Sequence, residues 1–360
     1  MTATPASQHP HRLHRLAMRV AGAAGMLLAG AVLAHTPAPP TPALVQPAST
    51  APLTALSPGA TTRAAPAARP ATPAQRVQLP GEPGTPALNA YWFVPRGGNA
   101  PRTQPLPVVV ALHGCGGLLG TRPEPIRVEA AANGGDSPSD AAAALQPRYR
   151  EYAQWLIERG YAVLMPDSLS AHGRLQGCGD SPEARGMDER LRRADALAAL
   201  RWVGRQRGID AARIVLLGWS NGAQAVLATV DASRPWPANI PPVERAVAFY
   251  PACKRAVQQH NFRLRAPVLL MIGGADDWTP ATRCAMLQSA VLARQPNARF
   301  RLEIYPGAYH GFDGTSELQG RRDTPGGGSR PGRGVTVGGD AVARVAAMAQ
   351  LDSWLASPDP

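Results

Sequence analysis

The feature that most constrains the fold of this sequence is a Gly-x-Ser-x-Gly turn at residues 218–222, with Ser220 at its centre. The apolar run 214–217 before it is typical of a buried strand, and residues 223–230 after it have the composition of a helix. A serine at the tip of such a turn adopts strained backbone angles, and the glycines to either side let strand and helix pass closely. This order is the context of a nucleophile elbow, so the rest of the chain is expected to supply a base, an acid and oxyanion donors.

Strand-like and helix-like segments alternate after residue 75. An edge strand is predicted at 88–94, apolar runs predict buried strands at 108–112 and 214–217, and further strands are predicted at 161–165, 245–250, 267–272 and 300–305. Helices are predicted at 148–159, 187–207, 223–230, 282–293 and 342–355, and loops at 118–144, 169–186 and 314–339. This alternation predicts an α/β class, with a mostly parallel, doubly wound sheet of about seven to eight strands and helices on both faces.

The N-terminal residues have the pattern of an export signal. Residues 1–19 contain three arginines and no acidic residue, residues 20–34 are apolar, and Val32 and Ala34 fit the −3 and −1 positions of a cleavage site. An uncleaved membrane anchor is the alternative, but the apolar stretch is shorter than the ~20 residues that span a bilayer. We therefore expect a signal peptide at 1–34, no stable membrane insertion after its cleavage, and a periplasmic or secreted protein.

Residues 35–75 consist almost entirely of Pro, Ala, Thr and Ser. They lack a periodic apolar pattern and cannot bury a core, which predicts a disordered linker. The catalytic domain is therefore expected at residues 76–357, a length that suits one large α/β unit.

The net charge of +12 does not indicate a nucleic-acid partner. All but one of the 37 basic residues are arginines, which are scattered along the chain, and aromatic residues make up only 5% of the sequence. A nucleic-acid surface would need clustered basic and aromatic residues. The four cysteines form no Cys-x-x-Cys motif, so a zinc site is not expected, and no other motif indicates a metal or an organic cofactor.

Ser220 needs a base, because a serine hydroxyl is a poor nucleophile until a neighbouring group accepts its proton. Elbows of this type use the chain order Ser, acid, His, and only His260 and His310 follow the serine. His260 lies in a polar, helical segment, whereas His310 follows the last strong strand in a glycine-rich loop. His310 is therefore the predicted base, and His113, which precedes the serine, is predicted to be structural.

The acid is expected directly after a strand that lies between Ser220 and His310 in the chain. Asp276 and Asp277 both follow the predicted strand 267–272, and either could orient the imidazole ring. Asp313 is too close behind His310 to take this role in the expected topology.

The oxyanion hole requires two backbone N–H groups that point at one position. Asn221, the residue after the nucleophile, is expected to supply one of them at the N-terminus of a helix. The glycine-rich loop 113–117 follows a buried strand and is expected to supply the other, with Cys115 as the first candidate and Gly116 as the second.

These fragments, taken in order, resemble the dienelactone hydrolase family of α/β-hydrolases over roughly residues 106–312. The resemblance is carried by the fragments LHGCGG at 112–117, VLMPDS at 163–168, LGWSNG at 217–222, AFYPAC at 248–253, GGADDWTP at 273–280 and YHGF at 309–312. It implies the α/β-hydrolase fold and a triad of Ser220, His310 and an aspartate. Since the acid of the family stands four residues before the proline of such a turn, the resemblance favours Asp276 over Asp277.

The resemblance also suggests how the cysteines pair. It favours a disulfide between Cys253 and Cys284, and it brings Cys115 near Cys178. The alternative is that all four are reduced core residues.

The sequence therefore predicts an exported serine hydrolase that cleaves ester or lactone bonds of a small molecule or a polymer through an acyl-enzyme. The best-known relatives are cytoplasmic, use cysteine as the nucleophile and bind a substrate carboxylate through arginines. Here Ser220 takes the place of that cysteine, which implies a general serine esterase. Arg174 is the candidate for an arginine that binds a substrate carboxylate. The alternatives are a secreted polyester or carbohydrate-ester depolymerase and a binding protein on a hydrolase scaffold.

Overall fold

The computed structural model describes residues 73–95, 104–120, 142–179, 189–322, 324 and 334–358. The predicted export signal, nearly all of the predicted linker and most of the predicted loop 118–144 lie outside the described residues. Within them, no helix combines the length and the apolar character that a membrane crossing requires.

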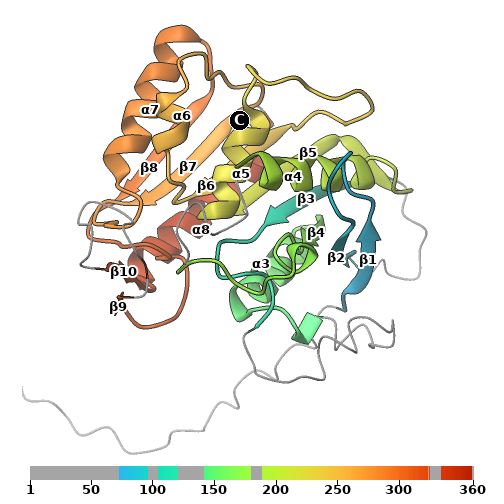
Figure 1. The fold of residues 1–360 in the computed structure, drawn as a ribbon, viewed down its shortest axis with the longest axis horizontal. Helices are drawn as coiled ribbons and strands as arrows, with labels where there is room; N and C mark the ends of the chain where they lie inside the picture. Colours follow the sequence, from blue (N-terminus) through green and yellow to red (C-terminus); the bar gives the residue numbers. More distant parts are fainter. Residues whose placement is uncertain are drawn as a thin grey trace, which may run out of the picture. The chain divides into compact units, whose positions relative to one another are not determined.

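An eight-stranded sheet forms the centre of this part of the chain (Figure 1). Its strands run in the order β1-β2-β4-β3-β5-β6-β7-β8. They are β1 (Gln75–Leu79), β2 (Leu88–Phe93), β3 (Leu106–Leu112), β4 (Ala162–Pro166), β5 (Ile209–Trp219), β6 (Arg245–Phe249), β7 (Val268–Gly273) and β8 (Phe300–Tyr305). The strands from β4 to β8 pair in parallel, and only β1 and β2 pair antiparallel with their neighbours. This mostly parallel sheet confirms the predicted fold class.

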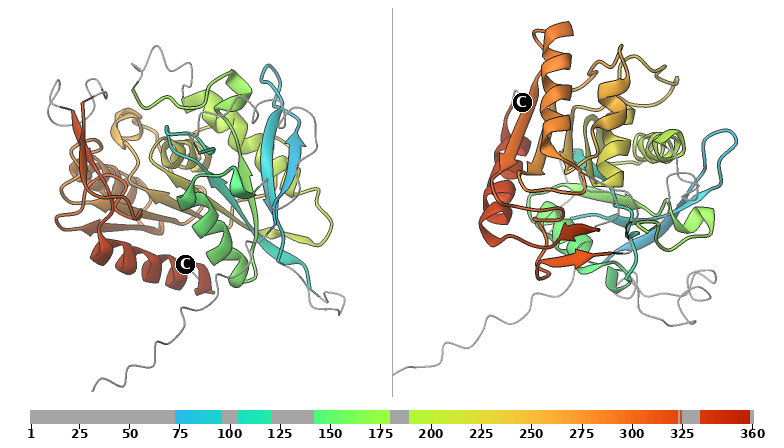
Figure 2. Two further views of the ribbon diagram at one scale, coloured as in Figure 1. Left: turned by 90° about the horizontal axis from the view of Figure 1, so that it is seen from below. Right: turned by 60° about the vertical axis from the view of Figure 1, so that its left-hand side comes forward.

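Helices cover both faces of the sheet. They are α3 (Pro147–Glu158), α4 (Glu189–Val203), α5 (Asn221–Val230), α6 (Lys254–Gln258), α7 (Ala281–Arg294) and α8 (Ala341–Ala356). Figure 2 shows α3 and α8 on one face and α4, α5 and α7 on the other. Because helices exclude water from both faces, β6 and β7 are buried along their whole length, which explains the apolar sequence of β7 and of β6 after Arg245.

Two expectations about the fold were wrong. The strand predicted at 88–94 is not at the edge, because β1 pairs with β2 along five residues and is itself the edge strand. The predicted loop 314–339 contains a two-stranded antiparallel ribbon of β9 (Gln319–Arg321) and β10 (Val335–Val337). β1 and β9 are polar, and β10 has only three residues, so none of them shows the longer apolar pattern by which a strand can be recognised in a sequence.

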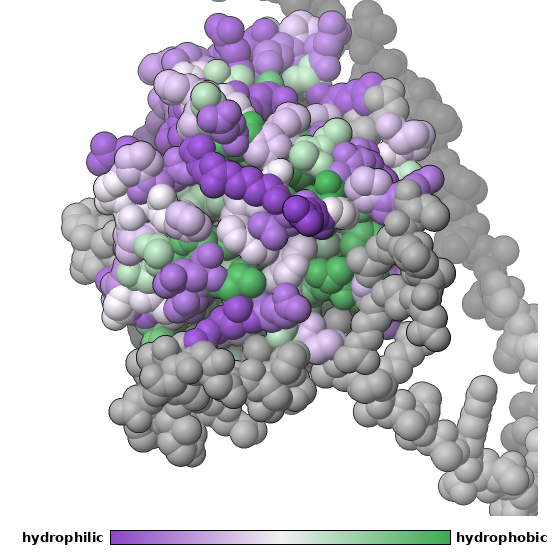
Figure 3. Space-filling view, turned by 90° about the vertical axis from the view of Figure 1, so that its right-hand side faces the viewer, coloured by the Kyte–Doolittle hydropathy of each residue, from purple (hydrophilic) through white to green (hydrophobic). Residues whose placement is uncertain are grey.

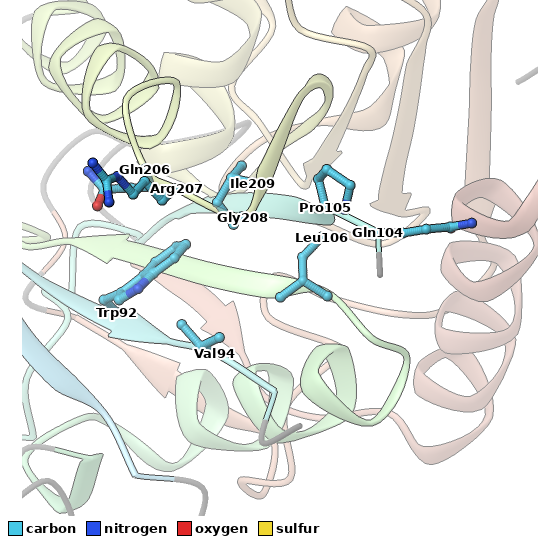
Figure 4. A pocket seen from close by; sticks show the side chains of 9 residues that line it. All are labelled: Trp92, Val94, Gln104, Pro105, Leu106, Gln206, Arg207, Gly208 and Ile209. Carbon is cyan, nitrogen blue, oxygen red and sulfur yellow. The ribbon is translucent and has the colours of Figure 1, made fainter. Parts of the chain in front are cut away.

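The described surface offers a hollow far from Ser220. A cavity of about 340 Å³ lies at the amino ends of β3 and β5, whereas Ser220 follows the carboxyl end of β5 (Figure 4). Its lining residues are Trp92, Val94, Gln104, Pro105, Leu106, Gln206, Arg207, Gly208 and Ile209. The face seen in Figure 3 carries hydrophilic residues interrupted by small hydrophobic patches rather than one broad apolar area.

Candidate active site

Ser220 lies at a strained turn between β5 and α5. Its backbone has φ 52° and ψ −115°, in a region that a residue with a side chain rarely adopts. A methyl group on Gly218 would lie 2.5 Å from the carbonyl oxygen of Gly222. A methyl group on Gly222 would collide with the carbonyl oxygen of Leu112. Both glycines are therefore required for the close passage of strand and helix, as the motif predicts.

His310 connects Ser220 with a buried carboxylate. Its Nε2 lies 3.0 Å from Ser220 Oγ, and its Nδ1 lies 2.8 Å from Asp276 Oδ2. Asp276 Oδ1 accepts hydrogen bonds from the backbone N–H groups of Trp278 (2.9 Å) and Thr279 (2.7 Å). The carboxylate is thus held by the turn before α7 with one oxygen facing the imidazole ring.

Thr279 is a part of the site that the sequence reasoning missed. Its hydroxyl group lies 2.8 Å from Asp276 Oδ2 and 3.1 Å from His310 Nδ1, and only 6% of the residue is exposed. In the sequence, Thr279 lies in the same turn as Asp276, one residue before Pro280. A threonine in a turn is too common for this position to indicate a role in the site.

The structure separates the candidates that the sequence left open. Asp277 points away from His310 and accepts hydrogen bonds from the backbone N–H (2.8 Å) and hydroxyl group (2.9 Å) of Thr336 on β10. His260 is exposed in the turn after α6. Of the two aspartates, only Asp276 contacts the imidazole ring of His310.

His113 is completely buried and holds the loop after β3. Its Nδ1 lies 2.7 Å from the carbonyl oxygen of Gly114, and its Nε2 accepts the backbone N–H of Ser168 at 3.1 Å. Burial, and then the charge of Arg192, lower the pKa of His113 well below its ordinary value of 6.5. The ring is therefore neutral, with its proton on Nδ1, and links the loops after β3 and β4.

This neutral histidine makes stability depend on pH. As the pH falls below about 6.5, the unfolded chain binds a proton that the folded chain does not, so the free energy of unfolding decreases by up to about 1.4 kcal/mol per pH unit. We expect thermal melts to show this loss between pH 7 and pH 5. The variant His113→Asn, which is less stable at pH 7, should lose less on acidification. Equal pH slopes for the two proteins would show that His113 does not carry the effect, and the comparison cancels the titrating groups that lie away from His113.

The glycine-rich loop after β3 lies directly beside the nucleophile. A Cβ atom on Gly114 would be 3.5 Å from Ser220 Cβ. The N–H of Gly114 donates to the hydroxyl oxygen of Tyr149 at 3.0 Å, so it is already paired. The next amide in the chain is that of Cys115, and the amide of Asn221 begins α5 on the other side of the serine.

The four cysteines form two disulfides, Cys115–Cys178 and Cys253–Cys284. Both pairings are those that the resemblance suggested. The first joins the loop after β3 to the loop after β4, which also contains the half-buried Arg174. The second joins the start of α6 to α7. Each disulfide therefore fixes a loop at the carboxyl end of the sheet.

A second buried carboxylate lies behind the site. Asp313 is 2% exposed and accepts hydrogen bonds from Trp219, Tyr152 and Tyr250, with Arg148 nearby. The sequence reasoning considered this aspartate only as an acid for His310. The sequence does not reveal the cluster, because its members are dispersed over α3, β5 and the loops that follow β6 and β8.

The described residues contain no group of three or more His, Cys, Asp and Glu side chains that could hold a metal ion. The polar groups around Ser220 are instead connected through hydrogen bonds to one another.

Comparison with known proteins relates this arrangement to one family. The model of the dienelactone hydrolase family matches residues 144–330, which is more than half of the 360 residues. An uncharacterized protein of Mycobacterium tuberculosis is 33% identical over 138 residues, which cover 32% of this chain and 44% of that protein. The chain thus spans less than half the length of the curated relative that it matches.

Two solved structures have the same fold. One is a dienelactone hydrolase-like promiscuous phosphotriesterase from metagenomic libraries, with a TM-score of 0.52 and 16% identity over 79% of this chain and 98% of that chain. The other is esterase 2 of Thermogutta terrifontis phosphoramylated by tabun, with a TM-score of 0.51 and 17% identity over 79% and 94% of the two chains. At this level of identity the likeness extends to the α/β-hydrolase fold alone.

Proposed function

This chain belongs to the dienelactone hydrolase family, and we propose that it is a serine hydrolase that cleaves carboxylic ester bonds. The observation that carries the proposal is the unbroken series of hydrogen bonds from Asp276 through His310 to Ser220 Oγ. A nucleophile, a base that contacts it and an acid that orients the base are the parts that acyl transfer requires.

In the proposed reaction, Ser220 Oγ attacks the ester carbonyl carbon while its proton passes to Nε2 of His310. Asp276 accepts the hydrogen bond from Nδ1–H, which holds the ring in the reactive tautomer and stabilises the imidazolium ion. The backbone N–H groups of Cys115 and Asn221 stabilise the oxyanion. The tetrahedral intermediate then collapses, the C–O bond to the alcohol breaks, and the alcohol oxygen takes the proton from His310.

The acyl-enzyme is resolved by water. His310 Nε2 accepts a proton from the water molecule as its oxygen attacks the acyl carbon, and the same proton returns to Ser220 Oγ when the acid leaves.

Trp278 lies against the imidazole ring, with ring centroids 4.6 Å apart, and Arg321 lies over the indole at 5.9 Å. We propose carboxylic esters, including lactones, as the substrate class, because the chain belongs to the dienelactone hydrolase family.

We further propose that the enzyme acts outside the cytoplasm. Its two disulfides support this location, because such bonds persist in oxidising compartments. The export signal predicted at residues 1–34 supports it independently.

The proposal is tested by labelling with a fluorophosphonate, which phosphonylates an activated serine. We expect one label per folded molecule, on Ser220, and loss of hydrolysis of short nitrophenyl esters in parallel with labelling. The variant Ser220→Ala should take up no label and show only background hydrolysis, while its two disulfides and its thermal midpoint show that it is folded. A folded wild-type protein that remains unlabelled, or a Ser220→Ala variant that hydrolyses the esters at the wild-type rate, would contradict the proposal.

A further inference from the structure

Asp313 accepts hydrogen bonds from three different parts of the fold. Its Oδ2 lies 2.9 Å from Nε1 of Trp219, at the end of β5, and 3.0 Å from the hydroxyl oxygen of Tyr152 on α3. Its Oδ1 accepts the hydroxyl group of Tyr250, which follows β6, at 2.6 Å. A carboxylate that is 2% exposed and accepts three hydrogen bonds fixes all of its donors, because any that moved would remain buried without a partner.

Arg148 completes the cluster and supplies its positive charge. Its guanidinium group lies 3.7 Å from Asp313 Oδ1 and donates to the hydroxyl oxygen of Tyr250 at 2.8 Å and to the carbonyl oxygen of Gly311 at 3.2 Å. Burial is the largest single influence and opposes this charge, but the Asp313 carboxylate and the neighbouring hydroxyl groups of Tyr250, Tyr149 and Tyr152 together outweigh it and raise the pKa of Arg148. The guanidinium group contacts Gly314 so closely that a Cβ atom there would collide with it. The loop after His310 therefore packs against the guanidinium group of Arg148 at Gly311 and Gly314.

The residues held in this way are direct neighbours of the proposed catalytic groups. Trp219 immediately precedes Ser220, and Gly311 immediately follows His310. The ring of Tyr250 packs on the imidazole ring of His310 with centroids 4.6 Å apart, and its backbone has φ 41°. Asp313 itself contacts neither Ser220 Oγ nor the imidazole ring, so it can act on them only through these neighbours.

We propose that Asp313 is a positioning residue, which holds the turn of Ser220 and the loop of His310 at the separation that their 3.0 Å hydrogen bond requires. This inference rests on the proposed function of Ser220 and His310. Serine and base must be aligned to well under 1 Å for attack, and a misplacement of about 1 Å costs roughly 100-fold in rate. Asp313 belongs to the loop of His310, and its carboxylate binds the indole N–H of Trp219, the residue before Ser220, so it connects the two segments and provides that alignment.

The experiment measures how fast a fluorophosphonate modifies Ser220 in folded variants. Asp313→Asn keeps the size of the side chain but replaces one acceptor by a donor, and Tyr250→Phe removes the hydroxyl group that links Asp313 to Arg148. We expect both variants to react about 10- to 100-fold more slowly than the wild type, with a similar loss of kcat and a KM on a short ester changed by less than about threefold. All rates are measured well below each variant's thermal midpoint.

Tyr161→Phe is the matched control. It also removes one buried tyrosine hydroxyl group, which donates to the carbonyl oxygen of Leu355 at 3.2 Å and lies outside the site. It should lower the thermal midpoint yet react at the wild-type rate. If Asp313→Asn and Tyr250→Phe fold and react with the fluorophosphonate as fast as Tyr161→Phe, the inference is overturned and the cluster only stabilises the fold. If Asp313→Asn does not fold, the rate of Tyr250→Phe decides. A wild type that does not react would overturn the proposed function, and this inference with it.

Discussion

Replacement of His310 by alanine is expected to lower kcat for ester hydrolysis by roughly 10⁴- to 10⁶-fold. Without the ring, none of the residues that the structure describes lies within hydrogen-bonding distance to accept the proton of Ser220 Oγ, so the hydroxyl group remains a poor nucleophile. KM should change little, because the ring acts on the transition state rather than on substrate binding. Steady-state kinetics on a short nitrophenyl ester measure the effect.

His260→Ala is the control for this prediction. It is the other histidine that follows Ser220 in the chain, and it is exposed in the turn after α6. Its replacement should leave kcat within about twofold of the wild-type value. If the two variants lost activity equally, or if His310→Ala kept more than about one hundredth of the wild-type kcat, His310 would not be the base.

Replacement of Asp276 by asparagine is expected to lower kcat by roughly 10³- to 10⁴-fold. The amide has no charge to stabilise the imidazolium ion, and its NH₂ group can stabilise the tautomer that leaves Nε2 protonated and unable to accept the serine proton. Asp277→Asn alters the neighbouring carboxylate, which contacts Thr336 instead of His310. It should retain kcat within about threefold, although it weakens the contact with β10.

Kinetics on the two variants side by side test the assignment. The change in charge and size is the same at both positions, so a difference in kcat reports the contact with the imidazole ring. A larger loss in Asp277→Asn than in Asp276→Asn would reverse the roles of the two aspartates.

The parts of this site that follow local sequence rules could be predicted, and the parts that depend on packing could not. The Gly-x-Ser-x-Gly turn and the strand before it define the elbow, and the chain order selects His310, whose ring the structure brings to Ser220. By contrast, residue spacing alone could not distinguish Asp276 from Asp277, because the turn geometry decides which carboxylate faces inward. A resemblance to the family was needed to favour Asp276.

The same distinction applies to the fold. The buried strands are continuous apolar runs, and their predicted ranges agree with the observed ones to within a few residues, apart from the longer β5. The edge strand β1 and the ribbon of β9 and β10 were missed, because β1 and β9 are polar and β10 has only three residues, so pairing with a partner strand defines them. The Asp313 cluster was missed for a related reason, since its members only meet once α3, β5 and β6 have assembled.

The two disulfides divide the site into halves. One ties the loops after β3 and β4, the other ties α6 to α7 beyond β6, and neither crosses β5, which carries the nucleophile between them. The proposed oxyanion donor Cys115 therefore lies in the half that contains the Cys115–Cys178 disulfide. His310 and Asp276 lie in the half that contains the Cys253–Cys284 disulfide. Apart from the main chain, the contacts that align the two halves are non-covalent, and they include the sheet and the buried carboxylate of Asp313, which reaches from the loop after β8 to α3. Formation of the two disulfides can thus rigidify each half, but the alignment of one half with the other depends on the packing between them.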